Sequence, residues 1–375
     1  MVERSVLKMA DKMNHIERAM GALTGGDVDR FTTYPIACGV NRKLLNGGKG
    51  IKYSDWAHDP KLFAQAFIEG QKYFDFDFAI GLMDLSVMAG DLGAHVRMDD
   101  QNTPFVDKHL VNNPEDYEKL KVPDIRKGRS AVLLEGSKLY ADVLKSQVIT
   151  AGFLEGPLLA LSQTAGAERM FMDMFTNPSA VHAALKTMTA YDEEMVKGFG
   201  KTGVAGLCWD YLWGNYSCLG DKEYEEFEAK YARGLNKLTV DCGMAFCIHN
   251  CADMPHLKTQ VLDFKPVIYS MAYYPLIPDS PSASKVIADG YADNCLIGGQ
   301  IDPQLFIRGS VEKITKVTMD LCQEVKTALC KRGLKSKYCI ASGCEVPPDM
   351  STKIENIKAV VDTVKAHGQP LPLKK

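Results

Sequence analysis

One histidine and two cysteines have the residue types and surroundings that a catalytic metal ion requires. His249 and Cys251 form a His-x-Cys pair directly after an apolar run, and Cys344 follows another apolar run much later in the chain. An imidazole and two thiolates suit Zn²⁺ and leave a fourth position for water or substrate. The pair alone is weak evidence, because the chain has eleven cysteines and most unbonded cysteines are plain core thiols. The third thiol, also after a predicted strand, favours a zinc site.

Other polar and aromatic side chains follow the predicted strands in the same way. Candidates for proton transfer or substrate orientation are Asp84, Asp210, Tyr211 and Glu345, and candidates for substrate contact are Trp209, Trp213, Glu155 and Gln300. A carboxylate at such a place can be a general acid, a hydrogen-bond anchor or, most commonly, a helix cap. We assign Asp302, which precedes Pro303, to capping. The aromatic side chains predict a pocket for an aromatic substrate, with ordinary core packing as the alternative.

Eight short apolar runs, each followed by a helical pattern, must position these groups. The expected strands are residues 33–37, 78–82, 148–152, 204–208, 244–248, 267–271, 295–299 and 337–342. The expected helices include residues 60–73, 180–199, 221–241, 280–291, 311–332 and 351–367. Most of the strands are continuously apolar, which is typical of parallel strands covered on both faces. Eight strands alternating with helices predict an α/β fold, a closed (β/α)₈ barrel, whose catalytic groups follow the carboxyl ends of the strands.

The remaining segments complete a single predicted domain over residues 1–375. Residues 1–30 are expected to form a helical segment before the barrel, and residues 84–129 a long excursion after the second strand. Ser351 is expected to cap the last helix, and Gly333 to end the helix before the last strand. The tail, residues 368–375, has two prolines and two lysines and is expected to be flexible.

Composition and charge exclude several classes of function. The chain is 46% hydrophobic and 24% charged with a formal charge of −3, so a nucleic-acid partner is not expected. No apolar stretch approaches the roughly 18–20 residues that cross a bilayer. Charged residues throughout positions 1–23 argue against a signal peptide. We therefore expect a cytoplasmic protein with reduced cysteines, whose partners are small substrates or another protein. The oligomeric state stays open, with a homodimer among the alternatives.

Nearly the whole chain resembles the uroporphyrinogen decarboxylase superfamily. The similar segments are an opening helix and Asp-Arg turn (17–30), an aspartate segment (83–94), a glycine-rich turn (152–157), a helix-opening motif (219–227) and a closing segment (341–348). The decarboxylases carry an arginine-rich segment that grips carboxylates, whereas residues 37–42 of this chain retain only Arg42. They also have a histidine in place of Cys344 and lack the His-x-Cys pair. The resemblance is therefore closest to the zinc methyltransferases of this superfamily, whose metal motif matches His249, Cys251 and Cys344.

This resemblance implies a zinc enzyme that moves a methyl group between a small methylated substrate and the cobalt of a separate corrinoid protein. A methoxylated aromatic donor is favoured, and Asp84 ranks first among the acids because it occupies the place of the family's catalytic aspartate. The first alternative is methyl transfer from the corrinoid to a thiol such as coenzyme M. The others are uroporphyrinogen decarboxylation and a non-catalytic partner of a corrinoid protein.

Overall fold

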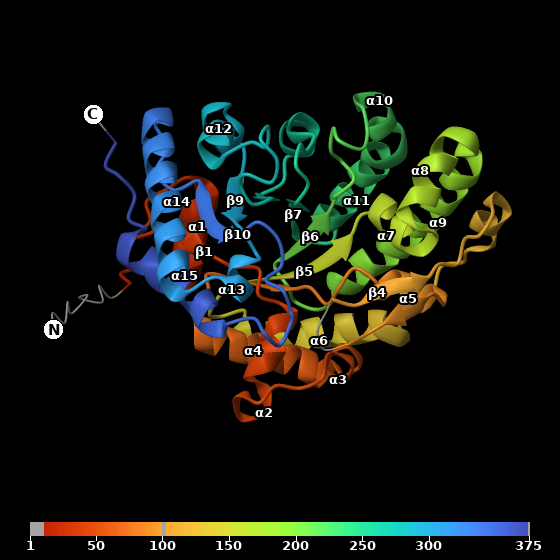
Figure 1. Ribbon diagram of the computed structural model, residues 1–375, viewed down its shortest axis with the longest axis horizontal. Coiled ribbons are helices and arrows are strands. Elements are labelled where there is room, and N and C mark those ends of the chain that lie inside the picture. The colour runs from red at the N-terminus through yellow and green to blue at the C-terminus, as the bar shows by residue number, and fades with distance from the viewer. Residues whose placement is uncertain (1–10, 100–102, 374–375) are drawn as a thin grey trace.

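Eight parallel strands form the wall of a nearly closed barrel in the computed structural model, which describes residues 11–99 and 103–373 (Figure 1). Neighbouring strands follow the order β1-β10-β9-β8-β7-β6-β5-β2. Their bounds are Thr32–Thr33 (β1), Phe78–Gly81 (β2), Ile149–Glu155 (β5), Gly206–Asp210 (β6), Ala245–Asn250 (β7), Ile268–Met271 (β8), Leu296–Ile301 (β9) and Tyr338–Ser342 (β10). Seven of these strands overlap the predicted apolar runs over several residues, while β1 shares only Thr33 with the predicted run 33–37. The predicted (β/α)₈ barrel is confirmed.

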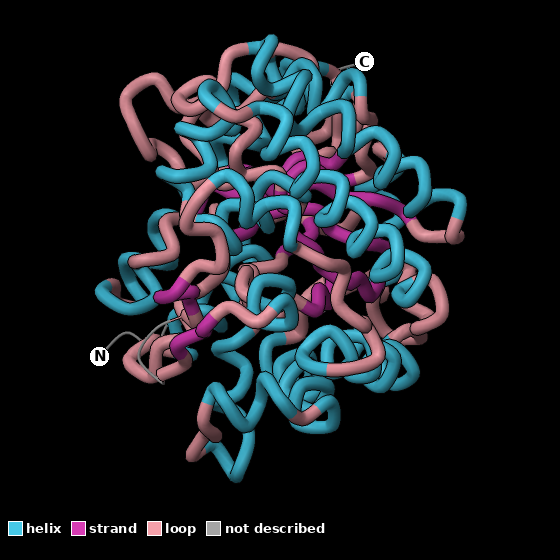
Figure 2. The backbone as a smooth tube through the Cα atoms, turned by 90° about the vertical axis from the view of Figure 1, so that its right-hand side faces the viewer, coloured by secondary structure: helices cyan, strands magenta, loops and turns pink. Residues whose placement is uncertain are grey.

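Helices form a shell around these strands (Figure 2). The longer ones are α1 (His15–Thr24), α4 (Pro60–Phe74), α6 (Gly128–Leu144), α7 (Pro157–Ala165), α8 (Ala167–Thr176), α9 (Pro178–Phe199), α11 (Lys230–Asp241), α14 (Val311–Arg332) and α15 (Ile354–His367). The shorter ones are α2 (Leu45–Gly48), α3 (Tyr53–His58), α5 (Val87–Leu92), α10 (Asp221–Tyr224), α12 (Ala283–Ala288) and α13 (Leu305–Arg308). Parallel strands covered in this way are buried on both faces, which explains their continuously apolar sequences.

The ends of some helices differ from the predicted ones. The helix expected over residues 221–241 consists of α10, a π-helical turn at Glu225–Ala229 and α11. Gly333 does end α14 in the left-handed conformation. Ser351 does not cap α15, because its backbone N–H binds the Asp349 carboxylate in a turn and Lys353 occupies the capping position. Asp302 does not cap α13 either, because Gln304 occupies the capping position, but its carboxylate accepts a hydrogen bond from the Gln304 N–H (2.9 Å) in the preceding turn.

The predicted excursion after the second strand is also present. It contains α5, an antiparallel hairpin of β3 (His95–Arg97) and β4 (Phe105–Lys108), and a 3₁₀ helix at Pro114–Lys119 (Figure 1). The predicted N-terminal helical segment is represented by α1, while its residues 1–10 and residues 374–375 of the tail lie outside the described residues. In the described parts of the chain, no helix combines the length and hydropathy needed to cross a membrane.

A buried charged cluster joins β1 to β2, where the barrel closes. The Asp77 N–H donates to the Thr33 carbonyl (3.2 Å), and the Asp77 carboxylate accepts from the Thr33 N–H (2.9 Å). The same carboxylate accepts from Arg30 (2.6 Å) and from Arg18 (2.7 Å), which lies on α1. Because Asp77 precedes β2 directly, these bonds fix the seam of the barrel to the N-terminal helix.

Candidate metal centre

The carboxyl ends of the strands surround a cavity of about 880 Å³. Its walls are largely apolar and include the aromatic rings of Tyr34, Phe78 and Phe153. Polar groups that line it include Asp84, Asp210, His249, Cys251, Ser270, Cys344 and Glu345, and also Asp302, Gln304, Arg308 and Asp349. A large apolar cavity with a few converging polar groups is the usual form of a small-molecule site.

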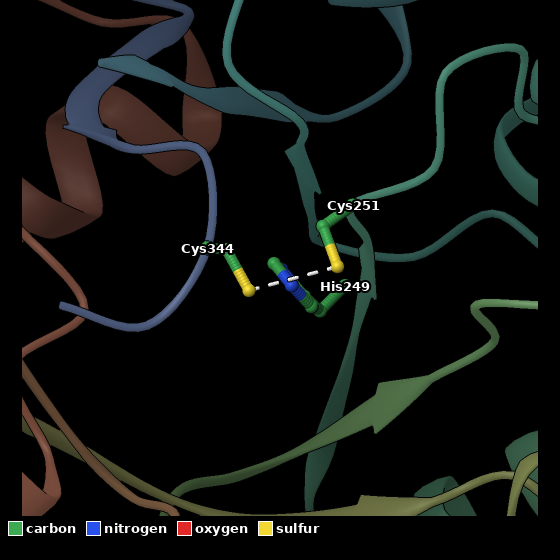
Figure 3. Close-up of side chains that lie close together, drawn as sticks. All are labelled: His249, Cys251 and Cys344. Carbon is green, nitrogen blue, oxygen red and sulfur yellow. Dashed lines mark hydrogen bonds between the residues drawn. The ribbon is translucent and has the colours of Figure 1, made fainter. Parts of the chain in front are cut away.

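His249, Cys251 and Cys344 converge in this cavity, as predicted from the sequence (Figure 3). His249 lies near the carboxyl end of β7, Cys251 follows β7 directly, and Cys344 lies in the loop after β10. One ligand atom from each of the three residues lies within 4.8 Å of the other two. The two sulfur atoms are 3.6 Å apart. Two sulfurs bound at about 2.3 Å to a tetrahedral zinc ion would lie about 3.8 Å apart, so the donor set fits this metal.

The orientation of the His249 ring also fits metal binding. Its Nδ1 atom lies 2.9 Å from Ser270 Oγ, on the adjacent strand β8. A metal-bound histidine usually engages its second ring nitrogen in such a hydrogen bond, which fixes the tautomer and the direction of the free nitrogen. Ser270 therefore holds the His249 ring with Nε2 available as the ligand atom.

The protonation of the two cysteines favours a cation between them. The adjacent Cys251 thiol and the His249 imidazole lower the pKa of Cys344 well below its usual range. The proximity of Cys344, together with burial, raises the pKa of Cys251. One thiolate therefore forms readily and the second is disfavoured beside it. A divalent cation relieves this repulsion, because metal binding displaces the proton from a coordinating thiol.

Two carboxyl groups, the buried Asp210 and the half-buried Glu345, lie beside the three predicted ligands. Asp210, at the end of β6, pairs in register with His249, and burial raises its pKa to about 7. Glu345 follows Cys344 and accepts a hydrogen bond from the Gly39 N–H (2.9 Å), and burial raises its pKa to about 8. Both groups can therefore hold a proton near neutral pH, as a general acid must.

Asp84 lines the same cavity and has different hydrogen-bond and ion-pair partners. It forms a buried ion pair with Arg129 of α6, and its Oδ1 accepts from the Ser86 N–H (2.9 Å) and hydroxyl (2.6 Å). The ion pair and the two hydrogen bonds fix the orientation of the Asp84 carboxyl group. This geometry favours a positioning role for Asp84 over proton donation.

The three predicted aromatic residues lie outside the cavity, contrary to the expectation of an aromatic pocket. Trp209 and Tyr211 face α11, where Trp209 donates to Thr239 (3.2 Å) and Tyr211 donates to Asn236 (2.8 Å). Trp213 donates from Nε1 to Ser162 of α7 (2.9 Å) and packs against Phe171 of α8. These side chains fill the space between the barrel and its helices, so the alternative of core packing describes them.

Glu155 and Gln300 also lie away from the cavity wall. Gln300 binds the Ala272 and Pro281 carbonyls (3.2 Å each) and the Ala283 N–H (2.9 Å), which holds the loop before α12. Glu155 is buried at the end of β5 and lines a separate, smaller cavity. The expectation that these two residues contact substrate is corrected accordingly.

The sequence does not predict two residues that contact the candidate site side chains. Ser270 and Arg129 are recognised only through their contacts with His249 and Asp84. The only sequence signal for Ser270 is a polar residue within an apolar strand. Arg129 gives no such signal, because it comes from a helix 45 residues after Asp84.

Residues 14–367 match the model of the family described as uroporphyrinogen decarboxylase (URO-D). The chain belongs to this family. Two curated relatives are methylcobamide:CoM methyltransferases MtbA. The one from Methanosarcina acetivorans is 24% identical, and the alignment covers 63% of this chain and 70% of the relative. The one from Methanosarcina mazei is 22% identical, and the alignment covers 84% of this chain and 91% of the relative. A solved methyltransferase from Methanosarcina mazei superposes with a TM-score of 0.77 at 17% identity, covering 94% of this chain and 98% of that one. The predicted family is confirmed, and these relatives are described as methyltransferases.

Within this URO-D family member, Arg42 cannot serve as the carboxylate clamp of a decarboxylase. It is fully buried, and it donates to the Pro348 carbonyl (2.9 Å) and the Ile51 carbonyl (2.9 Å). It is not among the residues that line the 880 Å³ cavity. Arg42 thus has a structural role, since it binds the loop that follows β10.

Proposed function

We propose that this protein is a zinc-dependent methyltransferase that moves a methyl group between a small methylated substrate and the cobalt of a corrinoid protein. The observation that supports this most directly is the convergence of His249, Cys251 and Cys344 at the barrel mouth, with space beside them for a reactant. When bound, zinc would act as a Lewis acid on the oxygen or sulfur atom that exchanges the methyl group.

The residues of the chain divide the remaining tasks. His249, Cys251 and Cys344 hold the ion, and Ser270 orients the imidazole. Asp210 and Glu345 exchange a proton with the reacting heteroatom, since both line the cavity, Asp210 buried and Glu345 half-buried. Asp84, fixed by Arg129, positions the substrate. Holding two reactants in line across a water-poor cavity contributes a large part of the rate of such a transfer.

The shape and lining of the cavity favour a methoxylated aromatic substrate. Its volume of about 880 Å³ exceeds what a two-carbon thiol needs, and the rings of Tyr34, Phe78 and Phe153 provide flat apolar contacts. A donor ether loses its methyl group to the reduced corrinoid, and its oxygen must then be protonated. Asp210 and Glu345, beside the candidate metal centre, can supply this proton.

The second candidate is methyl transfer from the corrinoid protein to a thiol such as coenzyme M. It is favoured by the curated relatives, both of which are described as methylcobamide:CoM methyltransferases. The same three ligands serve both reactions, so the difference lies in the cavity and not in the metal centre. Decarboxylation of a polycarboxylated tetrapyrrole is disfavoured, because Arg42 is buried away from the cavity.

Methyl transfer can be measured with free cobalamin in place of the corrinoid protein. Zinc-loaded protein is mixed with cob(I)alamin and a panel of methoxybenzoates, methoxyphenols, methanol and methylamines, and formation of methylcob(III)alamin is followed by absorbance. The reverse assay supplies methylcob(III)alamin and coenzyme M. The proposal requires turnover by the wild type and its loss in Cys344→Ala. The control variant Cys242→Ala, which changes a half-buried cysteine at the end of α11, should keep the wild-type turnover. Turnover of uroporphyrinogen by metal-free protein would contradict it.

A further inference from the structure

A second, much smaller cavity lies behind the wall of the active-site cavity. Its volume is about 20 Å³, enough for one water molecule. Leu82, Asp84 and Phe153 line both cavities, so they form the partition between them. Glu155 and Asp192 also line the smaller one, although their environment is otherwise apolar.

The two acids in this cavity have oxygen atoms that no described residue satisfies. Glu155 Oε2 and both carboxylate oxygens of Asp192 are fully buried without a hydrogen-bond partner among the described residues. Isolated buried carboxylates are strongly disfavoured unless they are protonated or solvated. Burial and the nearby carboxylates of Asp84, Asp192 and Asp210 raise the pKa of Glu155 well above its usual range, and Arg129 opposes this only in part. The unpartnered oxygen and the direction of this shift both favour the protonated form of Glu155.

A chain of hydroxyl groups leads from this cavity toward the surface. Tyr191 lines the cavity, and its hydroxyl lies 2.7 Å from the hydroxyl of Ser130. Ser130 is fully buried and donates to the carboxylate of Asp91, which is partly exposed. The three groups are contributed by α9, α6 and α5, and α6 packs against both α5 and α9.

We propose that Asp91, Ser130, Tyr191 and Glu155, joined by one water molecule in the small cavity, form a proton path from solvent to the back wall of the active site. Each hydroxyl accepts a proton from one neighbour and donates its own to the next. The path then reaches Asp84 in the partition and, on the neighbouring strand, Asp210, which is in register with Glu155.

The role of this path rests on the proposed function. In ether demethylation the C–O bond breaks, the oxygen keeps its electron pair, and the reduced corrinoid supplies the pair for the new bond to the methyl carbon. The departing oxygen then takes up one proton. In methyl transfer to a thiol, the S–H proton must leave instead. A corrinoid protein docked at the mouth covers the entrance from solvent, whereas the path through Asp91 approaches from the side.

Infrared spectroscopy of the zinc-loaded protein tests the path without a methyl-transfer assay. The band of the protonated Glu155 carboxyl is identified by subtracting the spectrum of Glu155→Gln, and its shift is followed after dilution into D₂O. We expect Tyr191→Phe and Ser130→Ala to slow this exchange at least tenfold. Ser137→Ala, a buried serine on the same helix outside the path, should exchange as the wild type does.

Two results would overturn the proposal. One is a Glu155→Gln spectrum without the loss of a protonated carboxyl band, since Glu155 would then carry no proton. The other is unchanged exchange in both Tyr191→Phe and Ser130→Ala, folding having been verified by circular dichroism. Because the readout is proton exchange, a protein that transfers no methyl group would still give a clear answer. Failure of the proposed function and failure of the path are thus distinguishable.

Discussion

The sulfur atoms of Cys251 and Cys344 lie 3.6 Å apart, although 93 residues separate them in the chain. This distance is too long for a disulfide bond and close to the separation of two sulfurs bound to one tetrahedral zinc ion. The barrel creates the proximity, because the loops after β7 and β10 open at the same mouth. His249 completes the set from β7, the strand that Cys251 directly follows.

The Ser270 hydroxyl is expected to strengthen metal binding through His249. Replacing it in Ser270→Ala removes the hydrogen bond to Nδ1 (2.9 Å) and frees the imidazole to rotate. We expect zinc affinity to fall about 10- to 100-fold, which is typical for the loss of an outer hydrogen bond to a ligand. Competition with a chromophoric chelator measures this. Ser137→Ala should bind zinc like the wild type, and an unchanged affinity in Ser270→Ala would show that the ring needs no such support.

The ion pair of Asp84 and Arg129 is expected to be essential for stability as well as for substrate position. Asp84→Asn leaves a buried guanidinium without its counter-charge, so the free energy of unfolding should fall by about 3–5 kcal/mol. The double variant Asp84→Asn/Arg129→Gln should recover part of this loss in chemical denaturation. Methyl transfer should stay low in both variants.

The surface pair Asp124–Arg126 provides the matched control for this prediction. It has the same residue types, but both side chains are substantially exposed. Asp124→Asn should leave stability and turnover unchanged. If Asp84→Asn, like Asp124→Asn, changed neither the free energy of unfolding nor the turnover, the positioning role of Asp84 would be refuted.

His15 is expected to make the stability of the barrel seam depend on pH. Although burial disfavours its cation, hydrogen bonds to Asp75 and Asp77 (2.9 Å each) raise its pKa to about 9. Because the folded-state pKa is raised, the stabilisation is complete below pH 6.5, the unfolded value, and is lost as the pH rises from there to about 9. After allowance for solvent screening at this partly exposed site, the loss should be about 2 kcal/mol.

Urea denaturation between pH 6 and pH 10 measures this effect. The wild type should lose stability over that window more steeply than His15→Gln, which cannot take up a proton. Equal slopes for the two proteins would exclude His15 as the titrating group.

The sequence predicts the strands and the grouping of His249, Cys251 and Cys344 well, because both depend on local patterns. A buried parallel strand must be continuously apolar, and reactive groups at its carboxyl end stand out against that background. The sequence misjudges Trp209 and Tyr211, since successive side chains of a strand point to opposite faces. Cys208 and Asp210 face the cavity, so Trp209 and Tyr211, which alternate with them, face α11. Partners from distant segments, such as Arg129 for Asp84, depend on tertiary packing that no local pattern encodes.

Zinc content and coordination test the central claim most directly. The purified protein is analysed by elemental mass spectrometry and by X-ray absorption at the zinc edge, beside Cys344→Ala and the control Cys242→Ala. We predict about one zinc per chain in the wild type and in Cys242→Ala, with two sulfur ligands and one imidazole nitrogen. We predict loss of most of the zinc in Cys344→Ala. Wild-type protein that takes up no zinc on reconstitution, or Cys344→Ala that keeps it with an unchanged sulfur shell, would contradict the account.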